Sequence, residues 1–411
     1  MNYNDLMYLN IAKNMYTQGD YILSKQAILQ VIEKCKDFPI NDQDLCDVFV
    51  SYDNICNVFG EDNTFFYKME YIFNNLDQIK VSKEFHVFFH TIYCTSLLRQ
   101  KRYNKAKNIL CYQNYINIPR LNFLEMSFFK PDDTDKILFI YYSGGIGDYI
   151  MLGRIVHKLC ETYKHNKIVW FISFTSLMWL FEDAFGGYSN LLLITEQHLQ
   201  HLNRFDHHCS LLQLYTFMNY TEYNSIFFIP YLGNIRINCQ MKHELFFNQI
   251  NEDKNYRKKI VLNWKGNPMN GHEKHNRRMN LQNTIPLLEI DDICWIIVNK
   301  SITLDEMELL NKYKNVYILK DIIPHFDDTR SFYDTILVLK HVDGVISTDT
   351  SIVHLALTMN IETYVLLTVG CEWRWTQNDT NTVWYPNANL IRQNKIHDWN
   401  NVIRQLLYIF Q

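Results

Sequence analysis

An apolar run that breaks at a glycine-rich turn and continues as a helix constrains this chain more than any other feature. The stretch is Lys136–Arg154, KILFIYYSGGIGDYIMLGR, with the apolar run at Ile137–Tyr142 and the turn at Ser143–Asp148. A strand, a glycine turn and a helix in succession form the unit of an α/β domain, and backbone N–H groups at such a turn face an anion or a substrate. We expect glycine here because the chain has to turn with positive φ and approach a ligand closely. The spacing is not G-x-G-x-x-G, so the dinucleotide fingerprint is not met.

Composition limits the classes to which the chain can belong. Its 411 residues predict two or three domains, and a hydrophobic content of 47% is enough for sizeable cores. A net charge of −4 lacks the basic excess of a dedicated nucleic-acid binder. The ten cysteines include no C-x-x-C pair, which indicates reduced thiols rather than a disulfide framework or a zinc site. The start does not resemble a signal peptide and no run of about 20 apolar residues occurs, so we expect a cytoplasmic protein without a transmembrane segment.

Residues 1–130 have the pattern of a helical domain. Two helices are expected around a turn at Gly19–Tyr21, and a similar pair within Phe89–Leu110 around a turn at Lys101–Tyr103. Small and aromatic residues in such pairs resemble tetratricopeptide units, although their spacing is not a clean repeat. A plain helical bundle fits the same pattern. In either case the region would dock a protein partner or an acceptor, or associate with a second copy.

Strands and helices begin to alternate after a polar linker at Pro131–Asp135. The first series spans residues 136–240, and its strands are expected at Ile137–Tyr142, Ile168–Ser173, Leu191–Ile194 and Ile226–Ile229. Helical stretches separate the first three strands. This βαβ order predicts a parallel sheet covered on both faces.

A second series spans residues 258–395, and a closing helix falls within residues 396–411 at Trp399–Phe410. Strands are expected at Ile260–Trp264, Trp295–Val298, Val316–Leu319, Gly344–Ser347 and Thr363–Leu367. Helices are expected near Gln282–Ile290, Leu304–Tyr313, Ser331–His341 and Ser351–Met359. The fold class is therefore α/β, with two Rossmann-like domains after an all-α region. Ligands of such sheets bind at the carboxyl ends of the strands, so a cleft is expected between the two domains.

A polar turn follows one of the buried strands of the second series. In Gly344–Ala356, GVISTDTSIVHLA, the turn Ser347–Ser351 offers hydroxyls, a carboxylate and the N–H groups of the next helix. Such a strand end can hold phosphates or a sugar. The alternative is an ordinary helix cap by Asp349 or Ser351, with His354 as a core histidine.

Cations and aromatic residues gather at two further turns. Asn263–Pro268 ends a strand, and the basic stretch His272–Arg278 follows; its cations can neutralise a diphosphate or simply form a solvated loop. The stretch Glu372–Trp375 and the later Trp384–Pro386 are rich in aromatic side chains. Such side chains either stack on a base or sugar, or cover the rim of the core.

Four stretches carry a resemblance to a known family. SGGIGD after the first strand, WKGNP at the start of the second series, STDTSIVHLA, and the WRW…WYP…RQ tail occur in this order. Together they resemble the heptosyltransferase-like glycosyltransferases of family 9, and in particular bacterial proteins that join such a region to tetratricopeptide repeats. The resemblance covers roughly residues 136–395. It implies a GT-B fold, an inverting mechanism without a catalytic metal, an acceptor domain at 136–240 and a donor domain at 258–395.

The resemblance assigns roles to individual residues. Asp148 matches the proposed general base, and Gly144, Gly145 and Gly147 form its loop on the acceptor side. Asp349, Thr350 and His354 match the donor motif, in which Ser351 stands where the family has glycine. The remaining donor-side residues would be Lys265, Asn267, Arg277, Trp373 and Arg374, with Arg277 as the preferred cation for the leaving diphosphate.

Three functions compete on this reading. The first is a glycosyltransferase that moves a sugar from a nucleotide-sugar co-substrate, without further cofactor or metal, to a glycan, lipopolysaccharide or protein acceptor. The second is a non-catalytic scaffold in which the helical region binds a partner. The third is a nucleotide-sugar epimerase, which would need further acid and base groups such as Glu273 and His325. No nucleic-acid partner is expected, and self-association through the helices remains open.

Overall fold

The computed structural model describes residues 3–34, 42–60, 63–75, 82–107, 127–130, 132–141, 144–199, 201–202, 204–214, 229–252, 256–270, 273 and 277–411. Contacts between Cα atoms group the chain into two compact units. One comprises residues 1–126 with 368–382, and the other comprises residues 127–367 with 383–411.

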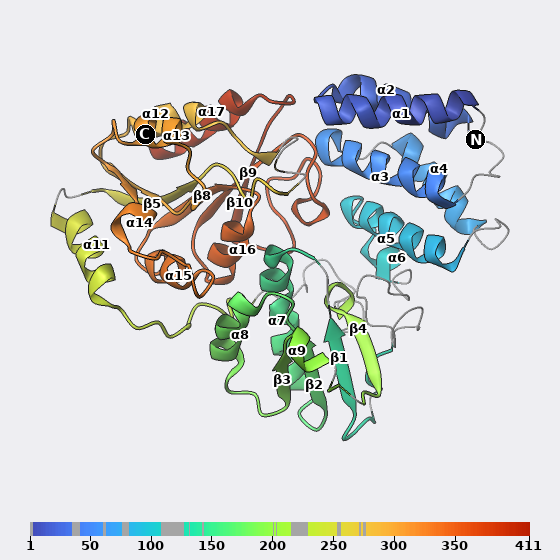
Figure 1. The fold of residues 1–411 in the computed structure, drawn as a ribbon, viewed down its shortest axis with the longest axis horizontal. Coiled ribbons are helices and arrows are strands. Elements are labelled where there is room, and N and C mark those ends of the chain that lie inside the picture. The colour runs from blue at the N-terminus through green and yellow to red at the C-terminus, as the bar shows by residue number, and fades with distance from the viewer. Residues whose placement is uncertain are drawn as a thin grey trace. The chain divides into compact units, whose positions relative to one another are not determined.

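Helices alone build the first unit as far as it is described (Figure 1). They are α1 (Tyr3–Gln18), α2 (Tyr21–Lys34), α3 (Asp42–Phe59), α4 (Asn63–Asn74), α5 (Lys83–Arg99) and α6 (Tyr103–Lys107). Gly19 joins α1 to α2 with a φ of +86°, a left-handed conformation that suits glycine. Lys101 takes the same region, with a φ of 59°, between α5 and α6. Both predicted helix pairs are thus confirmed, whereas their assignment to tetratricopeptide repeats stays a prediction.

A late segment of the chain belongs to this helical unit. Residues 368–382 contain the short 3₁₀ helix η7 (Trp373–Trp375), which packs against α5. The Gly370 N–H donates to the Val58 carbonyl over 2.9 Å, and Lys101 forms an ion pair with Asp379. This segment falls inside the range 258–395 that the sequence indicates for the donor domain, yet its contacts are with the helices.

The second unit opens with a parallel sheet in the order β3-β2-β1-β4. Its strands are β1 (Ile137–Tyr141), β2 (Lys167–Phe171), β3 (Leu191–Ile194) and β4 (His207–Ser210). The helices α7 (Ile146–Thr162), α8 (Met178–Phe185) and the short α9 (Glu196–Leu199) lie between the strands in sequence. Three predicted strands are confirmed. The polar strand β4 was not predicted, and the candidate at Ile226–Ile229 lies mostly outside the described residues.

A larger parallel sheet follows in the order β10-β9-β8-β5-β6-β7. Its strands are β5 (Lys258–Asn263), β6 (Ile293–Ile297), β7 (Val316–Ile318), β8 (Gly344–Thr348), β9 (Thr363–Leu367) and β10 (Ala388–Arg392). The helices are α11 (Met241–Glu252), α12 (Ile285–Leu288), α13 (Leu304–Leu310), α14 (Leu319–Ile322), α15 (Tyr333–Leu339), α16 (Ser351–Thr358) and α17 (Trp399–Phe410). All five predicted strands and the closing helix are confirmed, and β10 is an addition. The predicted fold class, two Rossmann-like α/β domains with an all-α region before them, is confirmed.

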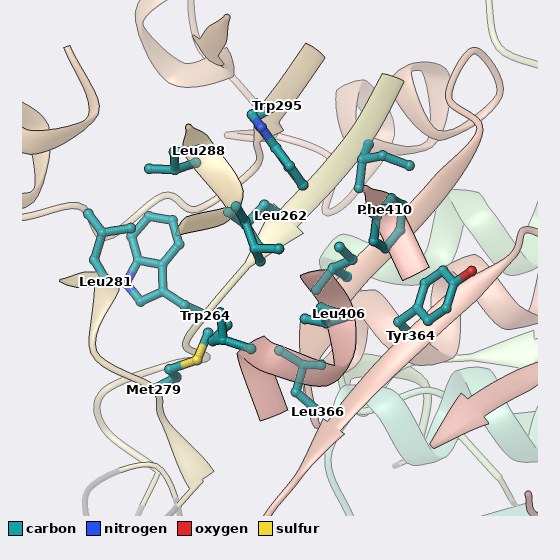
Figure 2. Packing of buried hydrophobic residues seen from close by; sticks show 14 of the residues in the cluster. Leu262, Trp264, Met279, Leu281, Leu288, Trp295, Tyr364, Leu366, Leu406 and Phe410 are labelled. Atoms are coloured by element: carbon teal, nitrogen blue, oxygen red, sulfur yellow. The ribbon is translucent and has the colours of Figure 1, made fainter. Parts of the chain in front are cut away.

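Apolar side chains from the strands and from α17 fill one face of the larger sheet. Trp264, Trp295 and Leu262 are fully buried, and Phe410 at the end of α17 packs edge-on against Trp295 with ring centroids 6.4 Å apart (Figure 2). Burial of large aromatic side chains is a strong stabilising term, so this core fixes the strands whose ends carry the polar turns.

Each sheet has a topological switch point, at which the order of its strands reverses. In the smaller sheet β1 lies between β2 and β4, and in the larger sheet β5 lies between β6 and β8. Open α/β sheets bind their ligands in the crevice outside the carboxyl ends of the strands at such a switch point. The glycine-rich turn follows β1 and the STDTS turn ends β8, so each of the two motifs stands at the switch point of its sheet.

Candidate functional site

The turn after β1 places Asp148 on the first turn of α7. Gly145 is the residue before the helix, with φ −75° and ψ 165°, and its N–H donates to the Asp148 carboxylate over 3.0 Å. Gly147 lies inside the helix. The expectation of positive φ is therefore wrong for Gly145 and Gly147, because both adopt backbone conformations open to any residue. Gly144 lies beside them, and Asp148, half-buried, stands where the partial positive charge of a helix N-terminus favours its ionised form.

The turn after β8 is held by hydroxyl and amide groups beneath it. Thr350 is the residue before α16 and makes no side-chain cap. Its hydroxyl oxygen instead lies 3.0 Å from Asn263 Nδ2, at the end of β5, and 3.1 Å from the Ser347 hydroxyl. Thr350, rather than Asp349 or Ser351, therefore occupies the N-cap position of α16. The hydrogen bonds join the ends of β5 and β8 at the switch point.

Asp349 is paired with the cation that the sequence favoured. Its Oδ2 lies 3.1 Å from Arg277 Nη2, and its Oδ1 lies 3.9 Å from His354 Nε2. The Asp349 side chain is 7% exposed and that of Arg277 is 20% exposed. A charge-assisted pair of this kind holds Arg277 at the end of β8, from which it can reach an anion.

Lys265 and Asn267, the two residues predicted on the turn after β5, have partners of their own. Lys265 Nζ lies 2.5 Å from Glu306 Oε2, at the first turn of α13, and Glu306 also accepts from the Trp264 indole over 3.0 Å. Burial raises the pKa of Glu306, but the hydrogen bonds from Lys265, Thr303 and Trp264 outweigh it and leave the pKa below its usual value. The exposed Asn267 accepts the Met269 N–H through its side chain over 3.0 Å.

A buried carboxyl group that the sequence singled out only for an epimerase stands beside this pair. Glu273 is 2% exposed. Burial raises its pKa, a hydrogen bond from the Gly266 N–H and the charge of Arg277 oppose the rise, and Asp349 adds to it. Perturbed carboxyl groups gather at functional sites, which makes Glu273 a candidate site residue. His325, the other residue considered for an epimerase, is exposed and lies 3.5 Å from Asp328, in the loop before α15.

The two Rossmann-like halves meet through α7 and α16. A β-carbon on Gly147 would stand 2.5 Å from His354 Cδ2, so glycine is what allows the helix ends to approach. His354 Nδ1 is 2.9 Å from the Tyr385 hydroxyl. The buried Arg154 of α7 lies over the Tyr385 ring, 4.5 Å from its centroid, and donates to the Trp384 carbonyl. Sequence reasoning noted the aromatic pair Trp384 and Tyr385 but did not foresee that α7 would bind it.

The predicted donor residues Trp373 and Arg374 lie in the helical unit. The Arg374 guanidinium is 5.2 Å from the centroid of the Trp373 ring, within η7. Their assignment to donor binding stays a prediction. Among the residues that the structure describes, no group of three or more His, Cys, Asp or Glu side chains is placed to hold a metal ion, and no helix is long and apolar enough to cross a membrane.

No protein-family model and no curated protein matches the sequence. Solved structures do resemble the chain. A family 9 glycosyl transferase from Veillonella parvula matches with 9% identity and a TM-score of 0.41, over 67% of this chain and 96% of that one. An E. coli ADP-heptose lipopolysaccharide heptosyltransferase II matches with 13% identity and a TM-score of 0.40, over 67% and 98%. The iron-containing dodecameric glycosyltransferase TibC of E. coli matches with 8% identity and a TM-score of 0.38, over 66% of each chain.

Proposed function

We propose that this chain is an inverting glycosyltransferase that moves a sugar from a nucleotide-sugar donor to a hydroxyl group of an acceptor. One observation carries the proposal: the Asp148 turn and the Asp349–His354 turn each lie at the switch point of their sheet, and Gly147 brings them together at His354. A carboxylate from one sheet and a cation with helix N–H groups from the other are the parts that such a transfer requires.

In the proposed reaction Asp148 is the general base. It takes the proton of the acceptor hydroxyl while that oxygen attacks the anomeric carbon of the donor sugar. The bond from the anomeric carbon to the phosphate oxygen breaks, and the nucleoside diphosphate leaves with the electron pair. A helix N-terminus favours the carboxylate form of Asp148, which keeps it deprotonated at neutral pH but makes it a weak base. Desolvation by bound substrates would offset that weakness.

The donor's diphosphate would bind at the N-terminus of α16 beside Arg277. Arg277 is held by Asp349 and can stabilise the charge that develops on the leaving group. No metal is part of this proposal. The acceptor would be a glycan, a lipid-linked glycan or a protein, and the helical unit would dock that acceptor or a protein partner.

A donor screen tests the proposal. Wild-type protein is incubated with UDP-, GDP-, ADP- and CMP-sugars, with and without a cell lysate as acceptor source, and released nucleotide is measured. We expect acceptor-dependent release that Asp148→Asn abolishes, because the amide has the shape of the carboxylate but cannot take the proton. Donor binding, followed by thermal shift, should survive in that variant. Glu161→Gln, a change on the exposed end of α7, is the matched control.

Three outcomes would contradict the proposal in different ways. Undiminished release in Asp148→Asn would rule out Asp148 as the base. An isomerised sugar formed from the donor alone would favour an epimerase. The lack of a thermal shift with any nucleotide-sugar would favour a binding scaffold.

A further inference from the structure

Glu273 lies near the switch point of the larger sheet, and one of its carboxyl oxygens has no hydrogen-bond partner among the described residues. Its side chain is almost fully buried, and Oε1 accepts no hydrogen bond from any residue that the structure describes. A β-carbon on Gly266 would stand 2.9 Å from this oxygen and 3.3 Å from Thr350 Cγ2. The carboxyl group therefore lies against Gly266, after β5, and Thr350, after β8, is a second close neighbour of that glycine.

Two neighbouring strand ends show the same feature. Thr348 Oγ1, on the last residue of β8, and Asn299 Nδ2, just past β6, are buried and also lack a hydrogen-bond partner among the described residues. Buried polar atoms are paired in the great majority of cases, and each exception requires an explanation. Such atoms also occur elsewhere among the described residues, but these three lie at or after the carboxyl ends of the adjacent strands β8, β5 and β6, where open α/β sheets bind their ligands.

The charges around Glu273 select the chemistry of a ligand. Asp349 is a second carboxylate close enough to raise the pKa of Glu273, and Arg277 is already paired with Asp349. A phosphate placed against Glu273 would meet like charge. A carboxylate can accept hydrogen bonds but cannot donate them, so the group that fits Oε1 is a donor, an O–H or an N–H, and hydroxyl groups are the commonest donors on a nucleotide-sugar.

We propose that Glu273 is a specificity-determining residue that accepts a hydrogen bond from a hydroxyl of the nucleotide-sugar donor. This inference rests on the proposed function. Arg277 and the N-terminus of α16 would hold the phosphates, and Glu273 would read a sugar beside them. The hydroxyl can come from the ribose or from the transferred sugar, which share this chemistry.

Binding of three kinds of probe separates these roles. The probes are inorganic diphosphate, the nucleoside diphosphates UDP, ADP and GDP, and their sugar conjugates, with affinities measured by calorimetry. The variants are Glu273→Met, which removes the acceptor, and Glu273→Gln, which keeps an acceptor oxygen. Glu289→Gln, an exposed carboxylate after α12, is the matched control.

We expect Glu273→Met to weaken sugar-containing probes by roughly 10-fold or more, as for the loss of a hydrogen bond to a charged group. Diphosphate should bind as in wild type or more tightly, and Glu273→Gln should recover most of the loss. A loss already seen with nucleoside diphosphates assigns Glu273 to the ribose, and a loss confined to the sugar conjugates assigns it to the transferred sugar. Equal weakening of all three probes, or no change in any, overturns the inference while leaving the proposed function standing. Wild-type protein that binds none of the probes overturns both.

Discussion

Gly147 of α7 and His354 of α16 are in direct contact, so close that a β-carbon on Gly147 would overlap the imidazole ring. The ring has little room to retreat, because its Nδ1 lies 2.9 Å from the buried Tyr385 hydroxyl. The glycine therefore serves helix packing rather than an unusual backbone angle. Its contact joins the two switch points on which the proposed reaction depends.

Replacement of this glycine should destabilise the second unit. In Gly147→Ala the new methyl group meets His354 at 2.5 Å, and overpacking of this kind costs about 1–3 kcal/mol. Chemical denaturation measures the loss. Gly145→Ala is the control, since its β-carbon would meet only Asp148 Oδ2 at 3.6 Å and its φ of −75° suits alanine. Equal losses in the two variants would contradict the packing role of Gly147.

Substitutions in the ion pair of Arg277 and Asp349 should affect stability and nucleotide binding differently. Arg277→Met leaves a buried carboxylate without its cation, which typically costs about 3–5 kcal/mol. Adding Asp349→Leu removes that charge and should restore most of the stability, because well-packed apolar residues often replace a buried pair without loss. Neither variant should bind a nucleotide, as followed by calorimetry. Nucleotide binding in the double variant at wild-type affinity would show that the pair has only a structural role.

Much of the fold was predictable because most strands are apolar runs. β1, β2, β5 and β6 are buried along nearly their whole length, and hydrophobic pattern alone located them. β4 reads His-His-Cys-Ser and β10 reads Ala-Asn-Leu-Ile-Arg, so neither shows such a run. Their places come from pairing with β1 and β9, which a single sequence does not display.

The sequence predicted the site residues that follow strand ends, but not the contacts that distant segments of the chain make with them. Asp148, Asp349 and Arg277 follow β1, β8 and β5, and parallel strands bring their carboxyl ends to one edge. Lys265 was expected to face a diphosphate, but the pairing with Glu306, far along the chain, depends on how α13 packs. The return of residues 368–382 to the helical unit has no local signal at all, because it rests on contacts such as Gly370 with Val58.

A carboxyl group in the loop before α15 should make stability depend on pH. Burial raises the pKa of Asp327 to about 6, and Asp334 adds to the rise, against hydrogen bonds from Thr335 and from the Asp334 N–H. The native state then holds the proton more tightly than the unfolded chain, whose Asp has a pKa of 3.8. The stabilisation that protonated Asp327 gives the folded state is complete below pH 3.8 and is lost as the pH rises through about 6.

Removal of that carboxyl group should flatten the pH profile. Asp327→Asn cannot titrate, so the free energy of unfolding of wild type relative to this variant should fall by an amount on the order of 1–3 kcal/mol between pH 4 and pH 7. Asp334 contributes the opposite slope in both proteins, because Lys242 and His243 help to hold its pKa below the usual value despite burial. Urea denaturation across this range measures the difference. Asp321→Asn, an exposed change on α14, should leave the wild-type profile intact, and a parallel profile for Asp327→Asn would count against the assignment.

Glu273 should make the ligand-free protein less stable than it could be. Burial raises its pKa above the ordinary value of 4.5, so the native state binds a proton more readily than the unfolded chain. The stabilisation that protonated Glu273 gives the folded state is present below pH 4.5 and is lost as the pH rises through the higher native pKa.

Glu273→Gln removes the buried charge and should raise the free energy of unfolding at pH 7 by about 0.5–2 kcal/mol, the usual size of a stabilising change. The gain should shrink as the pH is lowered toward 4.5, where the wild-type carboxyl is itself protonated, and Glu289→Gln should show no such trend. A gain in stability in Glu273→Gln, together with the loss of affinity for sugar-containing probes in Glu273→Met, is what a residue kept for binding predicts. A destabilised variant at every pH would instead mean that the Glu273 carboxylate supports the fold.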